Sequence, residues 1–445
     1  NVAALTLLIY SLRYTARQLY GREAASAAAM LALGSLGLLI HAHEMQPQIV
    51  LTAMLAACLH GLVMMRSNPV HGALLTGTAS GAAFLAGGLP GLFLCLPLWL
   101  LNPACSGEYR TRNFLLAYRH ALWPFALLVA SWPLALALWQ PDFLRAWWAH
   151  ELAATMPHAG HLQRSKDFAN LIGWFTWPLW PVVLWSLWYR RGKLRAFGHS
   201  VPLASALLAL LLVASTGNMR PANLLPLLPA LILMAAGELC RLRRGAANAF
   251  DWFGVMTFSL LGLGLWLGWI AMNFGWPAPL ARNVLRLLPG FTPDWAWYQL
   301  LIAALLSVSW LIAILRLPFF PLRGAIHWAL GVTLAWGLAT SLWLSWFDYD
   351  KNYRPVSAAI AQAIESQNPA ACVSGVDLGD TQRAALFYFN GLRIAARGAS
   401  CPLRLAYATG RNAVPTPGDG WSEVWHLKRG RGRLAEQFAL YRRAN

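Results

Sequence analysis

The chain has 445 residues, of which 58% are hydrophobic and only 12% are charged, and it contains 24 tryptophans. A soluble protein of this length does not need so apolar a composition, whereas a polytopic membrane protein with interfacial tryptophans does. The formal net charge of +18 would fit a nucleic-acid-binding protein, but the arginines lie in short clusters between apolar runs, so we interpret them as topology signals. We therefore predict an all-α polytopic membrane protein that binds no nucleic acid.

Twelve apolar runs are candidate membrane spans, at residues 2–12, 23–41, 48–65, 71–86, 89–102, 114–139, 168–189, 200–216, 222–240, 253–272, 298–315 and 325–346. Six basic clusters recur at every second turn: Arg13/Arg17/Arg22, Arg66, Arg110/Arg112/Arg119, Arg190/Arg191/Lys193/Arg195, Arg241/Arg243/Arg244 and Arg316/Arg323. Placing all six on the cytoplasmic side satisfies the positive-inside rule. Because residues 2–12 are too short to span, we expect the chain to begin part-way through a helix, with the link 13–25 (RYTARQLYGREAA) after it and about 13 spans in the full-length protein.

The region 71–102 is the least regular part of this pattern. Gly87, Gly88 and Pro90 separate two runs that are each shorter than the roughly 20 residues of a straight span. We interpret the region as a hairpin, because one long helix would break the charge alternation downstream. Short helices interrupted by glycine and proline often line a cavity rather than face lipid.

Most of the unusual polar residues fall on the opposite, outer face. On this topology, that face holds residues 43–48 (HEMQPQ), 87–90 (GGLP), 140–167, 217–220, 273–297 and everything after Phe347. The asymmetry predicts chemistry at the outer leaflet.

Arg220 is the most informative of these residues. It directly precedes Pro221, which suits the first turn of a helix, and Pro226 and Pro229 loosen the helix that follows. A guanidinium fixed at a membrane surface in this way is suited to hold a lipid phosphate. The alternative is an ordinary snorkelling anchor.

The composition changes sharply near residue 348, so we divide the chain into a membrane domain, 1–347, and a small α/β domain, 348–445, on the outer side. The tail pattern predicts helices at NYRPVSAAIAQAIESQ and DTQRAALFYF, and strands at ACVSGVD, LRIAA, LRLAYAT, EVWHLK and FALYRR. Cys372 and Cys401 are the two cysteines of the tail and are a candidate disulfide if the tail is extracytoplasmic. Two buried free thiols are the alternative.

The order of these features resembles the membrane glycosyltransferases of the GT-C fold. The features are the basic link RQLYGREAA, the outward HEMQPQ, the GGLP break, an outer loop rich in Trp, His and Glu, the RPANLLPLLP helix start and the soluble tail. The resemblance is to the aminoarabinose transferases and protein O-mannosyltransferases (families 39 and 83). It implies a donor sugar on undecaprenyl phosphate and an acceptor lipid, glycan or protein at the outer face of the bacterial inner membrane.

The resemblance also shows departures. The family's catalytic acidic residue follows its first span, so we expect it upstream of Asn1 and leave the catalytic residue unknown. Gln48 stands where the aminoarabinose branch often has an aspartate, and Ala86 and Gly87 stand where many relatives have a lysine. If that lysine helps to bind phosphate in the relatives, Arg220 carries more of this role here.

Further candidate binding residues lie near the outer helix ends. Glu44 is a carboxylate at membrane depth, which is costly unless it is paired or functional. The alternative to a binding role is an interfacial glutamate hydrogen-bonded to His41 or His43. We assign substrate binding to Glu44, His43 and Gln48, and to Asn223 beside Arg220.

The segment 140–167 supplies another set. His150 and Glu151 lie in an amphipathic stretch that can close over a site or bind the acceptor, or can lie in the membrane interface through its tryptophans. His158 and His161 have a spacing that suits a divalent metal, but with no third ligand in view we predict no certain cofactor. Arg164 and Lys166 lie in the same outer segment, 140–167. In the 273–297 segment, Arg282 and Arg286 are placed to meet anionic head groups or an acceptor phosphate, with simple solvation as the alternative.

The implied chemistry is a single displacement at the anomeric carbon, which inverts it. It needs a cation at the phosphate, a carboxylate that activates the acceptor hydroxyl and a shaped cavity. A lipid or polysaccharide transporter or flippase is the alternative, disfavoured because no internal repeat is evident and intramembrane charges are nearly absent. A surface-polysaccharide polymerase or ligase is a third possibility.

Overall fold

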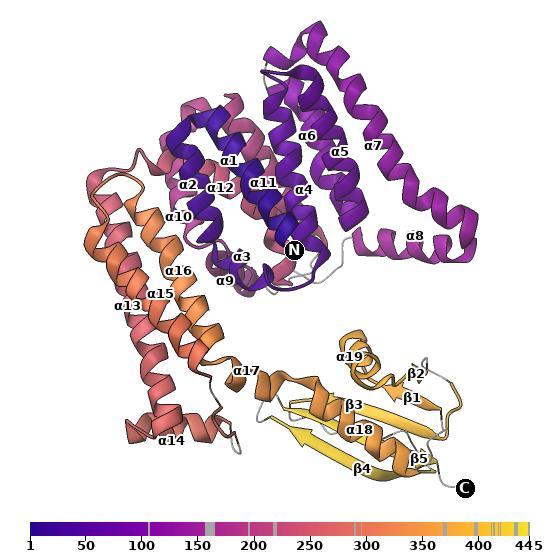
Figure 1. Cartoon of the computed structure of the whole chain (residues 1–445). Helices are drawn as coiled ribbons and strands as arrows, with labels where there is room; N and C mark the ends of the chain where they lie inside the picture. Colours follow the sequence, from indigo (N-terminus) through magenta and orange to yellow (C-terminus); the bar gives the residue numbers. More distant parts are fainter. Residues whose placement is uncertain are drawn as a thin grey trace. The chain divides into compact units, whose positions relative to one another are not determined.

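The computed structural model describes residues 1–105, 107–155, 165–194, 196–216, 220–288, 291–294, 296–367, 372–395, 399–410, 412, 414–416, 418, 420–430 and 435–443. The chain divides into two compact units. The first combines residues 1–262 with 305–337, and the second combines 263–304 with 338–445 (Figure 1).

The first unit is a helical bundle. Its helices are α1 (Val2–Tyr20), α2 (Arg22–Leu33), α3 (Leu36–His41), α4 (Pro47–Met64), α5 (Pro69–Gly87), α6 (Leu89–Cys105), α7 (Arg112–Trp139), α8 (Pro141–Thr155), α9 (Ser165–Phe175), α10 (Leu179–Tyr189), α11 (Phe197–Thr216), α12 (Leu228–Leu239) and parts of α13 (Arg244–Phe274), α15 (Trp297–Arg316) and α16 (Arg323–Leu342). Short 3₁₀ helices are η1 (Gly107–Arg110), η3 (Arg191–Lys193) and η4 (Pro221–Leu227).

Burial shows which helices form the centre of this bundle. The most apolar window of η4 and α12 is 89% buried and that of α4 is 72% buried, whereas that of α15 is only 11% buried. Seven helices of the described residues are long and apolar enough to cross a membrane. The polytopic helical fold predicted from the sequence is confirmed, and each predicted apolar run coincides with one or two helices.

Three of the predicted runs differ in detail. The link predicted from residue 13 is helical as far as Tyr20, because no helix breaker precedes Gly21, which has a φ of +101°. The run 23–41 breaks at Gly34, whose carbonyl accepts a hydrogen bond from Trp328 Nε1 at 2.7 Å. A Cβ on Gly34 would lie 2.6 Å from the Trp328 ring, so the glycine permits this contact. The run 168–189 breaks before α10, where Pro178 and Pro181 supply no N–H donor.

The region 71–102 is a hairpin, as predicted. Helix α5 ends at Gly87, α6 begins at Leu89, and the two helices pack on each other. A Cβ on Gly91 would lie 2.2 Å from the carbonyl oxygen of Ala83, so this packing requires glycine. Gly88 makes the reversal with a φ of +60°, which favours glycine.

The second unit holds the rest of α13, α14 (Ala278–Leu287), the start of α15, the end of α16, α17 (Leu344–Lys351) and the tail. The segment 273–297, predicted to lie on the outer face, contains the ten-residue helix α14. Pro277 opens this helix, and its apolar Ala281 and Val284 are buried, whereas Arg282 and Arg286 are exposed. Trp343 joins α13 to the end of α16, because its Nε1 donates to the carbonyl of Leu265 at 3.0 Å.

The tail is an α/β fold, as predicted. It contains α18 (Tyr353–Gln367), β1 (Val373–Val376), α19 (Asp380–Asn390), β2 (Ile394–Ala395), β3 (Leu403–Thr409), β4 (Trp421–Arg429) and β5 (Glu436–Arg443). The sheet has the order β2-β1-β3-β5-β4, with β1 parallel to β2 and β3, and β5 antiparallel to β3 and β4. Ile360, Leu386, Leu405, Phe438 and Leu440 form its core. The boundary at residues 347/348 stays a prediction.

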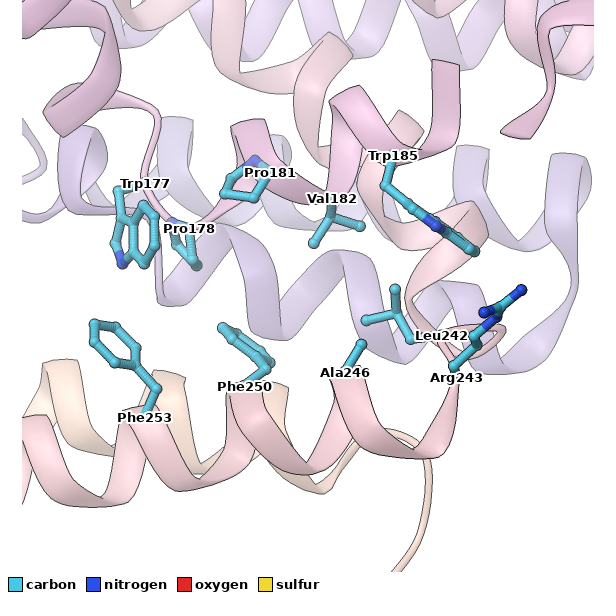
Figure 2. Close-up of a pocket in the computed structure, with 10 residues that line it drawn as sticks. All are labelled: Trp177, Pro178, Pro181, Val182, Trp185, Leu242, Arg243, Ala246, Phe250 and Phe253. Carbon is cyan, nitrogen blue, oxygen red and sulfur yellow. The ribbon is translucent and has the colours of Figure 1, made fainter. Parts of the chain in front are cut away.

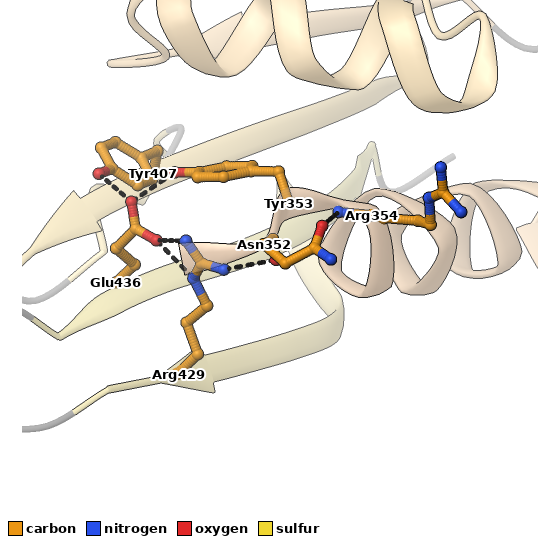
Figure 3. A network of polar contacts seen from close by, with 6 residues as sticks. All are labelled: Asn352, Tyr353, Arg354, Tyr407, Arg429 and Glu436. Carbon is orange, nitrogen blue, oxygen red and sulfur yellow. Dashed lines mark hydrogen bonds and ion pairs between the residues drawn. The ribbon is translucent and has the colours of Figure 1, made fainter. Parts of the chain in front are cut away.

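A polar network ties the start of α18 to this sheet (Figure 3). The Glu436 carboxylate accepts hydrogen bonds from Tyr353 and Tyr407, and Arg429 Nε lies 2.5 Å from its Oε2. Arg429 also donates to the backbone oxygen of Asn352 at 3.0 Å. In the same domain Cys372 and Cys401 are joined by a disulfide, with Cα atoms 5.2 Å apart.

Candidate functional site

The turn between α3 and α4 holds the first group of predicted site residues. His41 Nδ1 lies 2.6 Å from Glu44 Oε2, and Gln46 Nε2 donates to the same oxygen at 2.5 Å. Asn1 Nδ2 donates to the Glu44 backbone oxygen at 2.5 Å. The glutamate therefore has His41 as its histidine partner, while 41% of its side chain remains exposed.

His43 and Gln48 flank this turn. The exposed His43 ring stacks on Trp336 of α16, with centroids 4.9 Å apart. Gln48 is half-buried in the first turn of α4, and its side chain makes no hydrogen bond to any residue that the structure describes. Both side chains therefore lie at the N-terminal end of α4, where they can contact a bound molecule.

Arg220 stands at the start of η4. It is exposed, and within the described parts of the chain its guanidinium makes no hydrogen bond or ion pair. Its backbone oxygen accepts from the N–H of the half-buried Asn223 at 3.0 Å.

The predicted helix start after Arg220 is 3₁₀ rather than α-helical over Pro221–Leu227. Pro221, Pro226 and Pro229 cannot donate backbone hydrogen bonds, so a continuous i to i−4 ladder cannot form there. This 3₁₀ helix packs against α3 and α4, the two helices on either side of the Glu44 turn. The fold therefore brings the Arg220 helix start next to the segment that leads into the turn, although about 175 residues separate them in sequence.

Glu151 of α8 has a defined contact with the α5–α6 hairpin. Its Oε2 accepts a hydrogen bond from the backbone N–H of Leu89 at 3.0 Å, over 62 residues of sequence. A carboxylate at a helix N-terminus satisfies a free N–H and interacts favourably with the helix dipole. The neighbouring His150 is exposed and has no hydrogen-bond partner among the described residues.

The side chains of the remaining candidate residues belong to α14 or lie outside the described residues. Arg286 of α14 donates to Asn283 at 3.1 Å. His158, His161 and Arg164, with residues 217–219, lie outside the described residues, as does the side chain of Lys166. Within the part of the chain that the structure describes, no group of three His, Cys, Asp or Glu residues is placed to hold a metal ion.

Sequence reasoning missed two buried polar pairs. Glu238, with 1% of its side chain exposed, lies 2.9 Å from Arg190 Nε and joins α12 to the end of α10. Asp251 of α13 lies 2.6 Å from Nδ1 of the fully buried His327 of α16. Glu238 had a sequence signal, since an acidic residue at the end of an apolar span needs a partner. No local pattern identifies Arg190 as that partner.

Comparison with solved structures identifies the fold. The structure is similar to the crystal structure of ArnT from Cupriavidus metallidurans bound to undecaprenyl phosphate, with a TM-score of 0.66 and 15% sequence identity. The match covers 98% of this chain and 82% of the ArnT chain. The apo form of the same ArnT gives a TM-score of 0.63 with the same identity and coverage. The chain has the GT-C fold of ArnT. No protein-family model and no curated protein matches its sequence.

Proposed function

We propose that this protein transfers a monosaccharide from a polyprenyl-phosphate carrier to an acceptor hydroxyl group at the outer face of the membrane. The fold supports this proposal, because the similarity to ArnT extends over 98% of the chain, and that ArnT was crystallised with undecaprenyl phosphate. We further propose that the membrane is the bacterial inner membrane, with the tail in the periplasm and lipid A, a glycan or a protein as the acceptor.

The observation that carries the proposal is the exposed Arg220 guanidinium, which has no partner among the described residues. Glu44 and Glu151 are engaged by protein donors, whereas the exposed Arg220 guanidinium has no protein partner among the described residues. A guanidinium presents several donors in a planar fork that matches the oxygens of a phosphate. The helix start that positions it packs on α3 and α4, the helices that flank the turn with His43 and Glu44, and Gln48 lies in the first turn of α4.

The reaction follows from this arrangement. The acceptor oxygen attacks the anomeric carbon of the sugar, its proton passes to a base, and the bond between that carbon and the phosphate oxygen breaks. The electron pair of the broken bond goes to the carrier phosphate, where Arg220 stabilises the developing negative charge. Attack opposite the leaving phosphate inverts the anomeric centre. Glu44, His43, Gln48 and Asn223 supply polar contacts to the donor, and we assign His150 and Glu151 to the acceptor side.

A gene deletion tests the proposal. Mass spectra of lipid A, glycoproteins and surface glycans from the deletion strain should lose one sugar residue from one of these classes. Wild-type protein and the control Arg191→Ala, an exposed arginine of a predicted cytoplasmic cluster, should restore the sugar, whereas Arg220→Ala at equal expression should not. Restoration by Arg220→Ala would contradict the assignment. Loss of an entire lipid-linked glycan from the outer face, with no single-sugar defect, would instead support a transporter.

A further inference from the structure

A polar cavity lies at the far end of the η4–α12 segment that Arg220 precedes. Leu239, the last residue of α12, and Cys240 line this cavity, which has a volume of about 470 Å³. From the element lengths, this end is on the order of 30 Å from Arg220. The positive-inside rule places the arginines of this cavity on the cytoplasmic face, opposite to Arg220.

Two helices begin at this cavity with an arginine each. Arg244 is the first residue of the 31-residue helix α13, and Arg323 is the first residue of the 20-residue helix α16; both line the cavity with Asn248 and Asp251. The first turn of a long helix has free N–H groups and the positive end of the helix dipole, both of which favour an anion. A Cβ on Gly324 would lie 2.9 Å from the Phe250 ring and 3.3 Å from the Asp251 nitrogen, so glycine allows the start of α16 to pack against the second turn of α13.

The Arg323 guanidinium is held in place without being saturated. It lies over the Phe319 ring at 4.0 Å from the centroid, and only 13% of the side chain is exposed. Its buried Nη1 atom has no hydrogen-bond partner within the described residues, whereas Nε makes no hydrogen bond there but lies 3.5 Å from Asp251 Oδ2. A stacked guanidinium with unused donors is pre-organised for an oxyanion.

The acidic residue of the cavity has two partners on α16. Asp251 Oδ1 lies 2.6 Å from His327 Nδ1, and Oδ2 lies 3.5 Å from Arg323 Nε. The exposed Arg244 has no hydrogen-bond or ion-pair partner in the described part of the chain. The side chains that line the cavity therefore have an excess of positive charge.

An apolar groove adjoins the turn between α12 and α13, which also borders the polar cavity (Figure 2). It has a volume of about 340 Å³ and runs between α10 and α13, with Trp177 and Phe253 toward one end and Arg243 at the other. Leu242 lines both the groove and the polar cavity. An apolar groove beside a cationic cavity suits a phosphate carried on a lipid.

We propose that the cavity between the first two turns of α13 and the start of α16 binds a phosphate group through Arg244 and Arg323. The phosphate belongs to an anionic lipid head group or to free inorganic phosphate. This site goes beyond the proposed sugar transfer and does not depend on it, because Arg220 lies at the opposite end of the η4–α12 segment.

Native mass spectrometry of the full chain in detergent tests the proposal with phosphatidylglycerol and diacylglycerol as probes, with and without inorganic phosphate. Phosphatidylglycerol should bind, diacylglycerol should not, and both Arg323→Gln and Arg244→Gln should weaken binding by roughly tenfold or more. Arg244→Gln covers the case in which Arg323→Gln fails to fold, because Arg244 is exposed and unpaired among the described residues. Arg316→Gln, an exposed arginine outside the cavity lining, is the matched control.

The outcomes separate the two sources of phosphate. Competition by millimolar inorganic phosphate that depends on Arg244 supports free phosphate as a ligand, whereas arginine-dependent lipid binding without competition supports the head group. Wild-type affinity for phosphatidylglycerol and for inorganic phosphate in a folded Arg244→Gln variant and a folded Arg323→Gln variant would overturn the proposal. Absence of binding of any phosphate-bearing probe to the wild-type chain would also overturn it.

Discussion

The contact between Gly88 and Glu151 gives a prediction whose size follows from the structure. In Gly88→Ala the new Cβ would lie 1.9 Å from Glu151 Oε2, so the carboxylate must move away from the Leu89 N–H. Gly88 also has φ 60° and ψ −142°, where a residue with a side chain costs about 1–3 kcal/mol. Losing a hydrogen bond to a charged group costs about 1.5–3 kcal/mol. Because Glu151 is half-buried, we expect a total of roughly 2–4 kcal/mol in the free energy of opening the α6 start.

Hydrogen exchange of the peptide that contains the Leu89 amide measures this free energy. A loss of roughly 2–4 kcal/mol lowers amide protection by a factor of about 30 to 700. Glu151→Ala should lower protection less, and the double variant should show less than the sum, since both changes remove the same hydrogen bond. Gly173→Ala is the matched control, because no heavy atom lies within 4 Å of its Cβ position. Protection in Gly88→Ala within about twofold of wild type would refute the reasoning.

Three further predictions concern stability. Cys372→Ser should destabilise the tail by about 3–4 kcal/mol, given a separation of 29 residues, and equal thermal melting of variant and oxidised wild type would contradict this. Burial would raise the pKa of Glu436, but hydrogen bonds from Tyr353, Arg429 and Tyr407 and the charge of Arg429 lower it below 4.5. Stability from this carboxylate is therefore present above the unfolded pKa and lost as pH falls through the folded one, so Glu436→Gln should flatten the acid dependence of β5 hydrogen exchange. Arg190→Ala leaves the buried Glu238 carboxylate without its closest partner and should lower the free energy of unfolding by about 3–5 kcal/mol. Arg241 has 58% of its side chain exposed, so Arg241→Ala should change the melting midpoint little. Similar shifts of the melting midpoint in the two variants would contradict this difference.

Local patterns accounted for most of the secondary structure. The apolar runs and the alternation of LRLAYAT and FALYRR are visible within a few residues, and helices or strands lie at each of these places. The breaks were harder to predict, because their causes lie far away in sequence. The Gly34 break depends on Trp328, which is 294 residues distant.

In the candidate site, too, local features were predictable from the sequence and long-range contacts were not. Arg220 and its proline-rich helix start were predictable, because Pro221 and Pro226 mark the position locally. The packing of η4 against α3 and α4 and the Glu151–Leu89 hydrogen bond were not predictable, since both join segments that have no mutual pattern in one sequence. The 3₁₀ form of the helix start was implicit in the proline spacing, which removes consecutive donors of the α-helical ladder.

Binding of undecaprenyl phosphate to the purified chain tests the central claim most directly. Native mass spectrometry in detergent should show that wild type and Arg191→Ala bind the lipid equally. Arg220→Ala should bind it about 10- to 100-fold more weakly, because a hydrogen bond to a charged group is lost. Equal affinity of Arg220→Ala and wild type would contradict the role of Arg220 as the residue that holds the carrier phosphate.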